Sequence, residues 1–122
     1  MITITQLSKI GEDERGATHY FNTERTGEFI VAYRKAGSIS GRHYHKGIAT
    51  QKNPEKIIIM QGKASLNWFE VNGSRKGVEK INAPAMVEIE PWAWHEVIAE
   101  TDMIVLELNG LKDAKDDTFR VD

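Results

Sequence analysis

The stretch that decides the fold is Gly37–His45, which reads GSISGRHYH, together with Glu55–Gly62, which reads EKIIIMQG. Side chains two residues apart on a β-strand project to the same side, roughly 6–7 Å apart along the strand. On a strand, His43 and His45 therefore direct two imidazoles at one point. The apolar, β-branched run after Glu55 favours a further strand, which can add a carboxylate.

A third imidazole comes from His95, which lies 50 residues after His45 in the segment Pro91–Glu96. Since the chain contains no cysteine, a metal site can use only nitrogen and oxygen donors. Three imidazoles and a carboxylate suit a borderline divalent ion such as Zn²⁺, Ni²⁺, Fe²⁺ or Mn²⁺, and the sequence does not select among these ions. The predicted metal ligands are His43, His45, Glu55 and His95.

Length and composition predict one soluble domain. The 122 residues are enough for one domain, 1–122, whose barrel core we expect at about residues 28–109. A net charge of -2 argues against nucleic acid or an anionic membrane as a partner. The N-terminus lacks a secretory signal, and no apolar run approaches the roughly 18 residues of a membrane span, so a cytoplasmic location is expected.

Short β-type runs separated by turn residues predict an all-β, antiparallel domain. Gln61-Gly62 and Asn72-Gly73 supply tight turns, the apolar run Ile57–Met60 fits a central strand covered on both faces, and residues 111–117 are the one short helical candidate. The predicted strands are Ile2–Leu7, Ala17–Asn22, Glu28–Tyr33, Arg42–His45, Glu55–Met60, Lys63–Glu70, Gly77–Asn82, Met86–Ile89, His95–Ala99 and Met103–Leu108. The charged segment Gly11–Arg15 is expected to be a solvated turn.

An H-x-H pair alone fits two ordinary strand histidines as well as it fits metal ligands, and the residues around it decide between the two. Gly37, the H-x-H pair, Glu55 and Gly62 together resemble the first motif of the cupin superfamily, G-x5-H-x-H-x3,4-E-x6-G. Nine residues, 46–54, stand where that motif has three or four. We interpret them as a lengthened hairpin at the barrel rim that could act as a lid.

The second cupin motif, G-x5-P-x-G-x2-H-x3-N, is kept only in part. Pro91 is present and His95 stands one position early, while alanines at 85, 93 and 99 replace two glycines and the asparagine. The resemblance covers roughly Gly37–Leu108. It implies a cupin-type double-stranded β-helix, or jelly roll, closed around a central cavity.

Shorter matches resemble cupins of sugar metabolism. Gly41–Lys46 and Glu55–Ala64 resemble the cupin domains attached to capsular-polysaccharide sugar-nucleotide enzymes. Asp13–Gly16 and Pro91–Glu96 resemble small cupins that isomerise or epimerise nucleotide-linked keto-sugars. These resemblances imply a metal-binding isomerase or epimerase that acts on a sugar or sugar nucleotide.

Isomerising a keto-sugar requires a base beside the carbonyl and an electrophile that stabilises the enolate. Without a metal, His43 or His45 could be the base. With a metal bound, the ion would polarise the carbonyl while another side chain transfers protons. Strand alternation places Tyr33, Glu107 and Lys35 on the inner face as candidates for this role. Similarity to the sugar-isomerase cupins, which use histidine and tyrosine, makes Tyr33 the nearest tyrosine candidate.

Four further side chains are candidates for substrate contact. Trp92 and Trp94 alternate onto one face, where they could stack on a sugar or base, although burial between sheets or at a dimer seam explains them equally well. Lys35 and Arg42 are predicted to bind substrate as cations. Tyr44, between the two histidines, should face away from them.

Two other functions remain open. An Fe-, Mn- or Ni-dependent dioxygenase would use the same ligands with open positions for O₂ and substrate. A non-catalytic cupin would only bind a small molecule. In each case we expect a homodimer formed through sheet edges, with Ile2–Leu7 as the element to exchange.

Overall fold

The structure, a computed structural model, describes residues 1–121. Its strands are β1 (Ile2–Gln6), β2 (Ser8–Asp13), β3 (Gly16–Tyr20), β4 (Ile30–Arg34), β5 (Ile39–His43), β6 (Glu55–Gln61), β7 (Lys63–Glu70), β8 (Lys76–Asn82), β9 (Ala85–Ile89), β10 (Ala93–Ala99) and β11 (Met103–Glu107). They are followed by a short helix, α1 (Leu111–Asp116). Within residues 1–121, no helix is long and apolar enough to cross a membrane.

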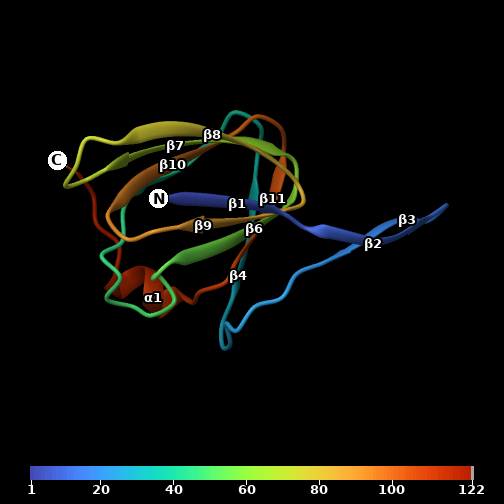
Figure 1. The fold of residues 1–122 in the computed structure, drawn as a ribbon, viewed down its shortest axis with the longest axis horizontal. Coiled ribbons are helices and arrows are strands. Elements are labelled where there is room, and N and C mark those ends of the chain that lie inside the picture. Colours follow the sequence, from blue (N-terminus) through green and yellow to red (C-terminus); the bar gives the residue numbers. More distant parts are fainter. Residues whose placement is uncertain (122) are drawn as a thin grey trace.

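Two antiparallel sheets form the body of the molecule. One contains five strands in the order β1-β9-β6-β11-β4, and the other contains four in the order β5-β10-β7-β8. In Figure 1, β7, β8 and β10 lie above β9 and β6, so the two sheets enclose the space between them. Strands distant in sequence become neighbours in both sheets, as in a double-stranded β-helix.

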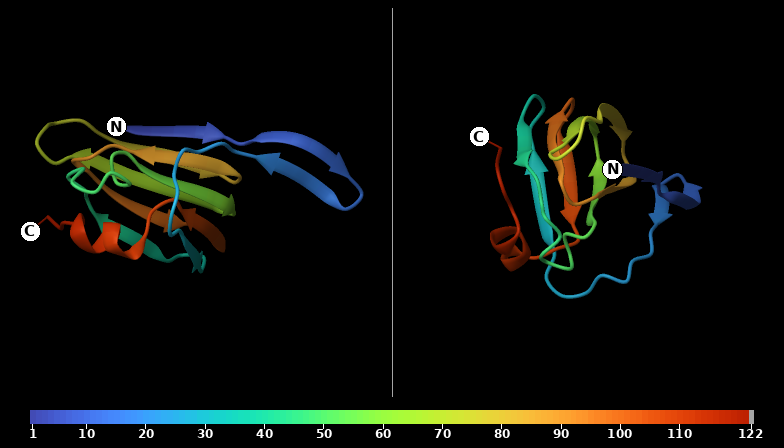
Figure 2. Two further views of the ribbon diagram at one scale, coloured as in Figure 1. Left: turned by 90° about the horizontal axis from the view of Figure 1, so that it is seen from below. Right: turned by 60° about the vertical axis from the view of Figure 1, so that its left-hand side comes forward.

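The remaining two strands form a separate hairpin. β2 and β3 pair with each other as a two-stranded sheet that extends away from the body (Figure 2, left). All six residues of β2 are exposed. We refer to this hairpin, residues 8–20, as the arm.

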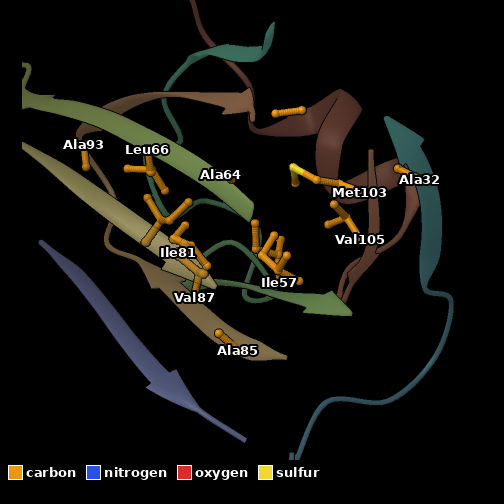
Figure 3. Close-up of a cluster of buried hydrophobic side chains, with 13 residues drawn as sticks. Ala32, Ile57, Ala64, Leu66, Ile81, Ala85, Val87, Ala93, Met103 and Val105 are labelled. Atoms are coloured by element: carbon orange, nitrogen blue, oxygen red, sulfur yellow. The ribbon is translucent and has the colours of Figure 1, made fainter. Parts of the chain in front are cut away.

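The inward faces of the two sheets share one apolar core (Figure 3). Ile57 of β6 and Val87 of β9 contact the same buried cluster as Leu66 of β7 and Ile81 of β8. Fully burying a side chain of this size contributes about 1.5–3 kcal/mol. The core therefore holds the sheets together and fixes the positions of the polar side chains between them.

The middle of β6 is apolar on both faces, as its sequence predicts. Ile59 points into the core between the sheets, while its neighbour Ile58 packs on the other side of the sheet with Met86 and Leu108. The central position of β6, between β9 and β11, explains why it has no polar face.

Each of the ten predicted strands is present, with ends shifted by at most three residues. The predicted tight turn at Gly62 is confirmed by its φ of 102°, and a Cβ there would meet the Asp102 carbonyl oxygen. The predicted helical turn is α1. The expectation of a solvated turn at Gly11–Arg15 is wrong in part, because Gly11–Asp13 belong to β2.

Candidate functional site

Three of the histidines converge at one point. His43 ends β5, His45 follows two residues later, and His95 lies on β10, where it is the register partner of His43. One ring nitrogen from each of the three side chains lies within 4.8 Å of the others. The H-x-H pair and the distant imidazole thus meet as the sequence predicts.

The approach of β5 to β10 depends on a glycine. Gly41 has a φ of 87°, and a Cβ there would come within 2.9 Å of the His95 carbonyl oxygen. The pairing of β5 with β10 shifts register between His95 and Glu96. Close, irregular pairing at this position brings the two histidine-bearing strands together.

Backbone carbonyls orient two of the imidazoles. His95 Nδ1 lies 2.9 Å from the carbonyl oxygen of Ala93, and His45 Nδ1 lies 2.5 Å from that of Asp117. A carbonyl oxygen only accepts, so both Nδ1 atoms carry the proton and donate it. In His95 this leaves the lone pair on Nε2, the atom nearest Glu55.

Glu55 lies against the histidines from the start of β6. Its Oε2 is 2.6 Å from His45 Nε2, and its Oε1 is 3.6 Å from His95 Nε2. The His45 contact is short, but its alignment does not make a hydrogen bond. Burial alone would raise the pKa of Glu55, but His45 and Lys52 lower it well below its usual value, so the carboxylate is ionised.

Lys52 is the residue of this cluster that sequence reasoning missed. Its Nζ lies 2.6 Å from Glu55 Oε2, and the side chain is only 3% exposed. It comes from the nine-residue segment 46–54, so this segment inserts a buried cation behind the carboxylate. No sequence signal marks it, because a lysine between Gln51 and Asn53 in a polar insertion is normally a surface residue.

The fit of a divalent metal ion to this cluster is partial. The three imidazoles are close enough to hold one, as nitrogen donors of the type that Zn²⁺, Ni²⁺ and Fe²⁺ accept. A metal ion at His45 Nε2 would have to share this atom's surroundings with Glu55 Oε2, which lies 2.6 Å away. One oxygen of the carboxylate that could serve as a fourth ligand, Glu55 Oε2, is already paired with the Lys52 ammonium.

A small cavity opens beside the cluster between the two sheets. Its volume is about 130 Å³, and its walls are mostly apolar. The polar residues lining it are Arg34, Ser40, His43, Glu55, His95 and Glu107. His45 and Lys52 lie behind Glu55, outside the lining.

The protein environment shifts the protonation of the lining residues. Burial first, and then the proximity of His95, lowers the pKa of His43 to about 3. Burial also lowers the pKa of His95. Burial and then the charge of Glu55 raise the pKa of Glu107. At neutral pH the cavity therefore presents neutral imidazoles and a carboxyl group that holds its proton more tightly than usual.

Comparisons with known proteins find similarity in structure only. No protein-family model and no curated protein sequence match the chain. The sugar 3,4-ketoisomerase QdtA from Thermoanaerobacterium thermosaccharolyticum, in complex with TDP, superimposes with a TM-score of 0.72 at 14% identity, over 98% of this chain and 88% of that one. The 3'-monoepimerase ChmJ from Streptomyces bikiniensis gives 0.75 at 16% identity, over 99% and 69%.

A third structure, the dTDP-4-dehydrorhamnose 3,5-epimerase from Sulfolobus tokodaii, gives a TM-score of 0.67 at 18% identity, over 88% of this chain and 68% of that one. The chain has the cupin fold. The expectation of a cupin-type jelly roll is thus confirmed. Sequence identities this low do not show that the chain has the same activity as these proteins.

Two predicted residues do not face the cupin cavity. Tyr33 is 73% exposed, and Tyr33 and Lys35 lie with Ile104 and Met103 in a shallow outer depression. Ala32 and Arg34 line the cavity instead. The parity prediction for Tyr33 and Lys35 is wrong by one residue. Glu107, predicted from parity on β11, does line the cavity.

The predicted pairing of Trp92 and Trp94 is also wrong. Trp92 has a φ of 65° in the turn before β10 and stacks on Tyr44, with ring centroids 5.5 Å apart. Trp94 stacks on Phe69 at 4.8 Å. Neither ring lines the cavity, because the turn breaks the strand alternation that would align them.

The last predicted substrate contact, Arg42, is exposed and paired elsewhere. Its Nε lies 3.1 Å from Glu96 Oε2, outside the cavity lining. Tyr44, which the sequence predicts to face away from the histidines, stacks on Trp92, and its ring also lies tilted against that of Phe119. The cation that does face the cavity is Arg34, whose Nε donates to Ser40 Oγ at 2.9 Å.

Proposed function

We propose that this cupin is an isomerase or epimerase acting on a nucleotide-linked keto-sugar. One observation carries the proposal: a neutral His43, the cation Arg34 and the acid Glu107 line a single cavity in the barrel. Support comes from solved cupins of the same fold described as a sugar ketoisomerase and sugar epimerases.

The residues fit the three tasks of the reaction. Burial lowers the pKa of His43 to about 3, below that of an ideal general base. The charge of Glu55 raises this pKa and stabilises the imidazolium that forms when His43 takes the proton from the carbon beside the carbonyl. Arg34 supplies positive charge for the enolate oxygen. Glu107, whose pKa burial raises, can return a proton to carbon from another direction.

The size of the cavity limits what can enter it. About 130 Å³ is below the roughly 300–1,000 Å³ of pockets that enclose drug-sized ligands. We therefore propose that the reacting sugar enters between the sheets while the nucleotide stays outside, at the mouth. The residues that contact the nucleotide are not assigned.

Solvent isotope exchange tests the function. The protein is incubated in D₂O with TDP-4-keto-6-deoxyglucose, the sugar nucleotide bound to one of the similar structures, and with other nucleotide keto-sugars. We expect deuterium to enter at a carbon next to the keto group. His43→Asn should slow the exchange by about 10²–10⁴-fold, the usual contribution of a general base.

The control is His19→Asn, which alters a histidine of the arm and should leave exchange unchanged. Absence of deuterium from every keto-sugar, with a folded protein, contradicts the proposal. If the same sugars nevertheless raise the melting temperature, the non-catalytic binding cupin is the better description.

A metal-dependent oxygenase is the second candidate, because three convergent imidazoles can hold iron with positions left open. Oxygen uptake by the iron-loaded protein, without isotope exchange, would favour it. The isomerase proposal needs neither iron nor oxygen.

We also propose that the protein is a homodimer. The segment predicted for exchange, Ile2–Leu7, lies for the most part in β1, which pairs with β9 of its own chain. The arm is the better candidate, since an isolated two-stranded hairpin is at most marginally stable in water.

A further inference from the structure

The position of Lys52 is fixed by its surroundings. Arg25 donates to the carbonyl oxygens of Gln51 at 2.6 Å and Pro54 at 2.5 Å, on either side of Lys52. The buried Asp117 carboxylate accepts from the backbone of Lys46 at 2.7 Å, near the start of the same segment. These bonds direct the Lys52 side chain inward, so its burial is a property of the whole segment.

The Lys52 ammonium is paired with the carboxylate that a metal ion at the histidines would use as a ligand. Lys52 Nζ and Glu55 Oε2 are 2.6 Å apart, and both side chains are withdrawn from water, at 3% and 6% exposure. A buried carboxylate needs one compensating charge, and lysine provides it.

A divalent ion at the histidines would compete with this arrangement in two ways. It would compete with Lys52 for the Glu55 carboxylate, and it would lie near a fixed positive charge in a region that screens charge poorly. Two like charges at close range in such a region repel strongly.

We infer that Lys52 is a built-in cation that takes the place of a metal ion at this cluster and keeps divalent ions from binding tightly. The ion pair with Glu55 balances the charge, so the three imidazoles stay uncoordinated. The inference concerns ion binding alone and holds whatever the substrate is.

Metal titration of the full chain tests this directly. Zn²⁺ and Ni²⁺ binding is measured by calorimetry at neutral pH, on protein purified without a histidine tag. Lys52→Met keeps most of the side-chain length and removes the charge, so it should bind at least about tenfold more tightly than wild type, the scale on which neighbouring groups change metal affinity. Lys52→Arg keeps the charge and should bind as weakly as wild type.

Two controls locate the effect. Lys56→Met removes a lysine that pairs with Glu24, at 3.3 Å, on the other side of β6, and should leave affinity unchanged. Adding His95→Asn to Lys52→Met should abolish the gain, because it removes one of the three imidazoles.

Equal metal affinity of wild type and a folded Lys52→Met protein overturns the inference, as does tight binding by Lys52→Arg. Should Lys52→Met fail to fold, wild type decides the matter. A stoichiometric metal ion retained through purification, or submicromolar Zn²⁺ binding, overturns the inference, and weak binding shared by wild type and Lys52→Arg supports it.

Discussion

Glu107 is partly buried and lines the same cavity as a second carboxylate, that of Glu55. Burial raises the pKa of Glu107, and the charge of Glu55 raises it further, although Lys52 and Arg34 oppose the shift. A raised pKa means that the folded protein binds this proton more tightly than the unfolded chain does. Glu107 therefore stabilises the fold only while it is protonated.

The sign of the pH dependence follows. The stability that protonated Glu107 contributes is fully present below its ordinary pKa of 4.5 and is lost as the pH rises through the higher folded value. Glu107→Gln mimics the protonated state at every pH. We expect the variant to exceed wild type in free energy of unfolding at pH 7 to 8, with the difference shrinking to nothing as the pH falls below the ordinary pKa.

Urea denaturation across this pH range measures the difference. Glu12→Gln is the control, because Glu12 lies on the exposed arm, and it should stay within about 0.5 kcal/mol of wild type throughout. A Glu107→Gln protein that is less stable than wild type at neutral pH, or a difference that grows on acidification, contradicts the assignment.

Residue-level prediction from the sequence succeeds where one strand carries the pattern and fails where several elements decide. The H-x-H spacing alone brings His43 and His45 toward one point. Which face of β4 turns inward depends on its pairing with β11, and no local pattern in the strand reveals that Arg34 rather than Tyr33 lines the cavity. The burial of Lys52 depends on contacts with residues far away in sequence.

At the scale of elements, the segment 46–54 is held by a buried arginine. Arg25 is 8% exposed, and its guanidinium donates to the carbonyl oxygens of Gln51 and Pro54. Lysine is no substitute at such a site, because its single ammonium cannot reproduce the planar fork. The arginine thus orders the segment that carries Lys52.

Arg25→Lys should loosen this segment. Hydrogen bonds to charged groups contribute about 1.5–3 kcal/mol each, so we expect a loss of roughly 2 kcal/mol in unfolding free energy. Hydrogen exchange should accelerate at the amides of Lys52 and Asn53, which bond within the segment, while amides of β7 change little. Mass spectrometry of exchange on the intact protein measures both.

The matched control is Arg15→Lys. Arg15 lies on the arm, and its guanidinium donates two hydrogen bonds to the Asp13 carboxylate. Its side chain is 85% exposed, so the substitution should leave the unfolding free energy and segment 46–54 nearly unchanged. Equal exchange in the two variants would show that Arg25 does not order the segment.

The element that sequence reasoning missed, β2, shows the limit of hydrophobic patterning. A half-buried strand alternates apolar and polar residues, but Ser8–Asp13 is exposed throughout and shows no alternation. β6 and β7, in contrast, were predicted almost to their ends because each packs on a core. An alternating hydrophobic pattern indicates that one face of a strand is buried, and no residue of β2 is buried in the single chain.

At the scale of the whole molecule, the arm is the feature that stands apart from the two main sheets. It leads away from the body of the barrel, and within residues 1–121 its two strands pair only with each other (Figure 1). Ile10 and Tyr20 on it are 63% and 54% exposed. A strand pair with open edges and apolar side chains in water is a surface that associates.

We predict that in the proposed dimer the arm contacts the outer face of β4 of a second copy. β4 is an edge strand of the five-stranded sheet, and Val31 and Tyr33 on its outer side are 53% and 73% exposed. A dimer in which each arm lies against this edge would cover apolar side chains on both partners. Tyr33, which faces away from the cavity, would then serve in association.

Light scattering on the full chain tests this arrangement, and we expect twice the 13.8 kDa mass of one chain. Ile10→Glu places a charge on the arm and should shift the protein toward the monomer by at least about tenfold in dissociation constant, since burying an unpaired charge is costly. Val78→Glu alters an equally exposed residue, at 60%, on β8 of the other sheet, and should leave the mass unchanged. A wild-type monomer at every concentration, or equal effects of the two variants, would leave the arm without this role.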